Sequence, residues 1–84
     1  MNLDEEAGIL ESLGEAIQMF GCKSRLAEKI GYTSQLVGMW TSGKTRISAE
    51  AAIRIQIATQ NAVMAYELRP DLPWREIIKP KRLL

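Results

Sequence analysis

The stretch LAEKIGYTSQLVGMW, residues 26–40, predicts two short helical segments joined by a tight turn. Gly31 stands near its middle and is suited to end the first segment, because glycine adopts the left-handed conformation at no steric cost. Thr33 follows as a good N-cap for the second segment. Ala27 is small enough to let two helix backbones approach closely. The stretch therefore predicts two helices that cross at a steep angle around a shared core.

The apolar residues of this stretch are spaced to point into one core; they are Leu26, Ile30, Tyr32, Val37 and Trp40. The opposite flank of the second helix is then left in water; it carries Ser34, Gln35, Gly38, Met39 and Ser42. This division is typical of a helix-turn-helix, here over residues 23–41, whose second helix enters the major groove of DNA. The alternative is a plain helical hairpin that packs only within its own domain.

Hydrophobic periodicity along the rest of the chain predicts an all-α fold, a small domain of about five helices. Helices are expected at 4–20, 23–30, 33–41 and 48–59, with single turns at 64–69 and after Asp71. Residues 61–63 are expected to be extended. We expect one domain over residues 1–78, followed by a basic tail over 79–84.

The composition excludes most kinds of catalytic site, because the 84 residues include no histidine and a single cysteine. Zinc-ligand sets, Ser-His-Asp triads and Cys-His pairs are therefore absent, as are Gly-rich phosphate loops. The chain is not expected to be an enzyme or to need a cofactor or metal. The lone Cys22 is expected to be an inert packing residue in the reducing cytoplasm. The acidic start, MNLDEE, is unlike a secretory signal.

Charge is distributed unevenly, although the whole chain carries only +1. Residues 1–22 contain five acids and no base, whereas residues 23–54 contain six bases and two acids, a local charge of +4. A basic middle beside an acidic start favours one face that meets an anionic partner. Ordinary scatter of surface charge is the alternative.

The segment 48–59 is apolar nearly all round, which is unusual for a helix on the surface of a monomer. Either the C-terminal part of its own chain covers its outer side, or a second subunit does. The residues expected at a subunit interface are Ile53, Ile57, Tyr66, Leu68 and Trp74. The alternative for Leu68 and Trp74 is that they fold back onto their own core.

A resemblance to a known family rests on GCKSRLAEKIGYTSQLVGMWTSGKTRISAEAAIRIQIATQNAV, residues 21–63, and on ELRPDL, residues 67–72. Over about residues 10–74 the chain resembles the Cro-like repressors of temperate phages, in particular the YdaS-like group, whose members are often labelled antitoxins. The resemblance implies a small lambda-repressor-like domain, usually a homodimer on a two-fold operator, that represses transcription. The chain departs from the family at Gly38 and Met39, where polar or basic residues are usual, and at Met64, where a threonine cap is usual.

The proposed site follows from this geometry. Base-reading residues are expected on the second helix: Ser34, Gln35, Gly38 and Met39. Gln35 is the strongest candidate, because its amide can pair bidentately with adenine. Phosphate-binding residues are expected on either side: Lys23, Ser24, Arg25, Thr33, Ser42, Lys44 and Arg46. The alternative for each is an ordinary solvated side chain.

The favoured function is a sequence-specific DNA-binding transcriptional regulator in the bacterial cytoplasm, bound to the nucleoid through double-stranded DNA. The alternative is an antitoxin-like module that binds and neutralises a partner protein, a toxin. The two are compatible, because such a module can also repress its own operon.

Overall fold

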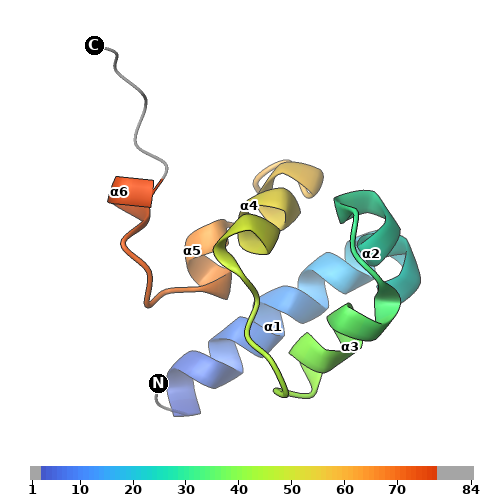
Figure 1. Ribbon diagram of the computed structural model, residues 1–84, viewed down its shortest axis with the longest axis horizontal. Coiled ribbons are helices and arrows are strands. Elements are labelled where there is room, and N and C mark those ends of the chain that lie inside the picture. Colours follow the sequence, from blue (N-terminus) through green and yellow to red (C-terminus); the bar gives the residue numbers. More distant parts are fainter. Residues whose placement is uncertain (1–2, 78–84) are drawn as a thin grey trace.

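The computed structural model describes residues 3–77, and every regular element within this range is a helix (Figure 1). In chain order the helices are α1 (Leu3–Phe20), α2 (Lys23–Ile30), α3 (Ser34–Thr41), α4 (Ala49–Ala58), α5 (Ala65–Leu68) and α6 (Trp74–Ile77). The predicted all-α class is confirmed, and the predicted helix boundaries agree to within one or two residues. The predicted tail, 79–84, lies outside the described residues.

The long helix α1 packs against α2, α3 and α5. Helix α4 packs against α2 and α5 and completes the core. Figure 1 shows α2 and α3 at one end of the domain and α6 at the far side from them. Helices α1 to α5 each place apolar side chains in the core. The fully buried members with large side chains are Leu13, Leu26, Val37, Ile55, Val63 and Leu68. One continuous core therefore fixes the position of the α2–turn–α3 pair.

The turn between α2 and α3 forms as its residues predict. Gly31 has φ 81°, and the N–H of Tyr32 donates to the carbonyl of Ala27 at 2.8 Å. Thr33 is extended, and its hydroxyl oxygen accepts from the N–H of Leu36 at 3.1 Å. Helix α2 thus ends and α3 begins with only three residues between them.

The connection after α4 differs from the prediction of an extended segment at 61–63. Gln60 and Asn61 have φ 55° and 69°, so the chain turns sharply. The buried Thr59 holds this turn: its hydroxyl donates to the Ile55 carbonyl at 2.9 Å and accepts from the Val63 N–H at 3.1 Å. The prediction of an extended segment was wrong because the buried Thr59 hydroxyl bonds the backbone groups of a tight turn. The spacing of apolar residues in the sequence does not show this turn.

Two further expectations are corrected by burial. Leu68 is fully buried, so its assignment to a subunit interface is wrong; it packs into its own core. Trp74 is half-buried against the same core, and its indole N–H donates to the Arg69 carbonyl at 2.7 Å. Cys22, expected to be a packing residue, is exposed at the N-cap of α2. Its position ahead of the helix places its side chain outside the apolar stripe.

Replacing Gly31 with alanine is expected to lower the free energy of unfolding by about 1–2 kcal/mol, because an L-residue is strained at this positive φ. An added Cβ would also lie 2.9 Å from Nη1 of Arg54, which must then move. Urea unfolding measures the change. The matched control is Gly14→Ala in the interior of α1, where an added Cβ would meet nothing within 4 Å. This substitution should raise the free energy of unfolding, because alanine favours a helix more than glycine does. Equal behaviour of both variants would contradict this account of the turn.

Candidate nucleic-acid interface

The polar flank of α3 faces outward. Ser34 and Gln35 are exposed, and Gly38 and Met39 are half-buried. The other flank is anchored by Val37 and Trp40, which are 0% and 4% exposed. A Cβ added at Gly38 would meet nothing within 4 Å, so packing inside the domain does not require a glycine there. The flank expected to read bases is therefore open to a partner.

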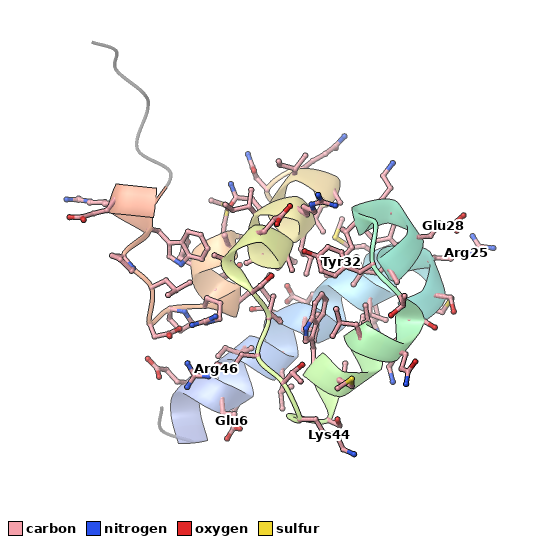
Figure 2. The ribbon with its side chains drawn as sticks, in the orientation of Figure 1. Glu6, Arg25, Glu28, Tyr32, Lys44 and Arg46 are labelled. Atoms are coloured by element: carbon pink, nitrogen blue, oxygen red, sulfur yellow. The ribbon has the colours of Figure 1, made fainter. Side chains whose placement is uncertain are left out.

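The N-terminus of α2 is open as well. Its N-cap residue is Cys22, which makes no side-chain capping hydrogen bond. The next three residues, Lys23, Ser24 and Arg25, are all exposed. Unpaired N–H groups at a helix start, together with the helix dipole, attract an anion. Figure 2 shows Arg25 projecting outward from α2.

The loop after α3 brings Lys44 close to the end of that helix. The N–H of Lys44 donates to the Met39 carbonyl at 3.0 Å, and Gly43, with φ 80°, allows the turn. In Figure 2 α3 lies between Arg25 and Lys44. Among residues 3–77, neither Lys23, Arg25 nor Lys44 forms an ion pair. These cations are therefore available on both sides of α3.

Two hydroxyls of the predicted phosphate set already have local roles. Thr33 accepts its capping bond, and Ser42 donates to the Met39 carbonyl at 3.2 Å. The Thr33 hydroxyl still has a proton to donate, because it is only an acceptor in the cap. Ser42 has already used its proton, so it is the weaker of the two as a phosphate donor.

Arg46 is turned away from α3 toward the C-terminal segment. Its Nη1 lies 3.2 Å from Oδ2 of Asp71, and Figure 2 shows it beside Glu6 of α1. Arg69 holds the same carboxylate with two bonds, Nε to Oδ1 at 2.9 Å and Nη2 to Oδ2 at 2.8 Å. Sequence reasoning missed this cluster, although ELRPDL was noted as a motif. Of the predicted cations, Arg46 is the one with a carboxylate partner.

Arg54 makes a second set of contacts near the candidate site that the sequence did not indicate. Its Nη1 donates to the Ile30 carbonyl at 2.8 Å, and its Nη2 pairs with Glu50 at 2.9 Å. The guanidinium lies 5.6 Å from the centre of the Tyr32 ring, which lies 5.7 Å from that of Trp40. Arg54 thus ties α4 to the turn that precedes α3. The i, i+4 spacing from Glu50 was the only signal in the sequence.

Asp71 is strongly acidic because of its arginine neighbours. Hydrogen bonds from Arg69 lower its pKa from 3.8 to about 2, and the charges of Arg69 and Arg46 act in the same direction. A carboxyl whose pKa falls on folding stabilises the fold at pH values above its unfolded pKa. That contribution is lost as the pH falls from about 4 to about 2.

Replacing Asp71 with asparagine is therefore expected to cost about 1–2 kcal/mol at neutral pH, after allowance for solvent screening. The difference between wild type and variant should shrink as the pH falls from about 4 to about 2, because protonation makes the two side chains alike. Urea unfolding at several pH values measures it. A difference that is constant over this range would contradict the assignment of the ion pair.

Other kinds of site find no support among residues 3–77. They contain no cluster of three His, Cys, Asp or Glu side chains that could hold a metal ion. No described helix is long and apolar enough to cross a membrane. A small cavity of about 170 Å³ lies between α1, the loop after α3 and α5, with Trp40 and Leu68 in its wall.

Comparisons with known proteins agree on one family. Residues 13–77 match the family described as bacterial toxin YdaS. Over 63 residues the chain is 33% identical to the Escherichia coli (strain K12) protein named "Putative transcriptional regulator YdaS". That alignment covers 75% of this chain and 64% of the relative, so the match spans less than two thirds of the relative's length. No solved structure gives a significant match.

Proposed function

The chain belongs to the family of the bacterial toxin YdaS, and from this premise we propose that it is a DNA-binding transcriptional regulator. The observation that carries the proposal is the open polar flank of α3, where Ser34 and Gln35 are exposed while Val37 and Trp40 anchor the helix. The regulatory name of the relative, which is 33% identical, supports the same assignment. In this proposal α3 enters the major groove of a short operator.

Gln35 is the main base-reading residue of the proposal. It lies in the first turn of α3, and residues at the start of a recognition helix are those that meet base edges. Its amide N–H can donate to N7 of adenine while its carbonyl oxygen accepts from the N6 amino group of the same base. In the proposal Ser34 contacts the DNA beside Gln35, and Met39, one turn later, touches a thymine methyl. Gly38 lets the helix backbone approach the groove closely.

The phosphate backbone is held from two sides. Lys23, Ser24 and Arg25 at the open start of α2 contact one strand, and Lys44 contacts the other. The Thr33 hydroxyl, at the start of α3, donates a further hydrogen bond to a phosphate oxygen. Such contacts fix the protein on the duplex but carry little information about sequence. Specificity therefore rests on α3 itself.

A homodimer is part of the proposal, because one helix reads only a few base pairs. Two subunits that read half-sites about 34 Å apart give useful specificity. Of the residues expected at the interface, Ile57 and Tyr66 are 68% and 55% exposed, and Ile53 and Trp74 are partly buried. These four are the residues that the proposal places between the subunits. A repressor acting on a two-fold operator is the form of regulation that this arrangement suits.

Selection of bound sequences from random duplex DNA tests the proposal. We expect a short two-fold motif containing adenine in each half, and light scattering on the complex should give two subunits per duplex. Random sequences recovered at low salt, without enrichment of any motif, would contradict a sequence-specific regulator.

A second candidate function is a toxin- or antitoxin-like module that binds another protein. Its supports are the net charge of only +1, the exposed Ile57 and Tyr66, and the toxin named in the family description. Purification of the protein from its native host distinguishes the two. A stoichiometric protein partner that survives high salt, with no DNA retained at low salt, favours this second function.

A further inference from the structure

Three charged side chains from two distant parts of the sequence form one cluster. Arg46, in the loop after α3, and Arg69, just after α5, both bind the carboxylate of Asp71. Two cations share one anion, so the cluster keeps one net positive charge. The sequence predicts that Arg46 binds phosphate, but in the structure it shares the Asp71 carboxylate with Arg69. The two arginines therefore compete for one anion.

The geometry assigns Asp71 to Arg69. Arg69 makes two hydrogen bonds to the carboxylate, at 2.9 and 2.8 Å, whereas Arg46 makes one, at 3.2 Å. The Arg69 side chain is 14% exposed and that of Arg46 is 56% exposed. A bidentate, desolvated pair is the stronger of the two. Arg46 is therefore held loosely and in water.

Arg69 is also fixed independently of Asp71. Its Nη1 donates to the carbonyl of Ile47 at 2.9 Å, and Ile47 is a core residue adjacent to Arg46 in sequence. The Arg69 carbonyl accepts from the Trp74 indole. The guanidinium thus stays beside Asp71 whether or not Arg46 is there. Within residues 3–77 the hydrogen bond of Arg46 is the one to Asp71, and it has no backbone carbonyl partner of this kind.

We propose that Arg69 is a positioning residue: because it holds Asp71 more strongly than Arg46 does, Arg46 can exchange its single bond to Asp71 for one to a DNA phosphate. This inference rests on the proposed function. Without the charge of Arg69, Asp71 would pair fully with Arg46, and the cluster would become neutral. The loop would then lose one phosphate contact although Arg46 itself is unchanged.

A set of charge variants tests the proposal through the salt dependence of DNA binding. Arg69→Gln keeps an amide that can donate to the Ile47 carbonyl but removes the charge. It is expected to make the log–log salt slope shallower by about 1 per subunit, the effect of one lost phosphate contact. Arg46→Gln should give the same change. The double variant Arg69→Gln/Asp71→Asn should restore the wild-type slope, because the Asp71 carboxylate that would otherwise hold Arg46 is then neutral.

Arg69→Lys is the matched control, since it keeps a charge beside Asp71 and should retain nearly the wild-type slope. A merely structural role for Arg69 predicts the opposite pattern, in which the double variant stays as impaired as Arg69→Gln. That result, or a wild-type slope for Arg69→Gln, would overturn the proposal. Circular dichroism of each variant verifies that the helices are formed.

A second readout needs no DNA and separates this inference from the proposed function. Inorganic phosphate is titrated while the Nε–H signal of Arg46 is followed by nuclear magnetic resonance. The shift should be clear in wild type, reduced in Arg69→Gln and recovered in the double variant. If wild type binds no DNA, the proposed function fails, and this titration still decides the role of Arg69. An unchanged Arg46 response in Arg69→Gln would refute that role.

Discussion

Raising the salt concentration from about 50 to about 200 mM should weaken operator binding by about 150-fold per subunit, because about four phosphates, neutralised by the three cations named below and by Arg46, give a log–log slope of about −3.6. The structure supplies cations for these contacts on both sides of α3: Lys23 and Arg25 on α2, and Lys44 in the following loop. Each displaces counterions from the duplex, so salt opposes binding directly. Fluorescence anisotropy with labelled operator at several salt concentrations measures the slope.

Single charge removals locate the contacts that produce this slope. Lys44→Gln should make it shallower by about 1 per subunit. Lys29→Gln removes an equally exposed charge at the other end of α2, which the proposal does not place on DNA, and should leave the slope unchanged. Equal changes in both variants would mean that only net charge matters. A slope near zero for the wild type would remove the phosphate contacts altogether.

Replacing Gln35 with alanine should weaken binding to the selected operator by about 5- to 150-fold, the range for one bidentate base contact. Gln35 is exposed in the first turn of α3, and its side chain makes no hydrogen bond within residues 3–77, so the substitution should leave the fold intact. The loss should be confined to operators that carry adenine at the contacted position. Competition between operator variants measures this preference.

The control for this loss is Gln18→Ala, which removes an exposed glutamine from α1. It should change neither affinity nor preference. A Gln35→Ala variant that binds more weakly but prefers the same base would make Gln35 a positioning contact. If both affinity and preference are unchanged, α3 does not read DNA through this residue, and the protein-binding alternative gains support.

Several parts of the site lay beyond prediction because they depend on contacts between distant segments. Arg46 was correctly placed in a basic loop, but its partner Asp71 is 25 residues away. Arg54 was counted only as charge, whereas its bond to the Ile30 carbonyl spans 24 residues. The apolar character of Leu68 is plain from the sequence, but the sequence does not show whether this side chain packs into its own core or against a second subunit.

The sequence by itself determined the helices and their ends. Gly31 stops α2, Thr33 and Ser48 cap the helices that follow them, and each of these devices acts within a few residues of its own position. Such interactions form wherever the local residues allow them, so a local pattern is enough to predict them. The order of exposed and buried residues on α3 followed from the same periodicity.

Only the tertiary structure decided which charges remain available and which apolar residues remain uncovered. Arg69 lies beside Asp71 and Ile47 because α5 packs on α1 and α4 and brings the C-terminal segment against the loop before α4. Ile57 stays exposed because no other described helix covers that side of α4. These outcomes depend on how helices pack against one another, and the side chains that decide the packing are spread over the whole chain.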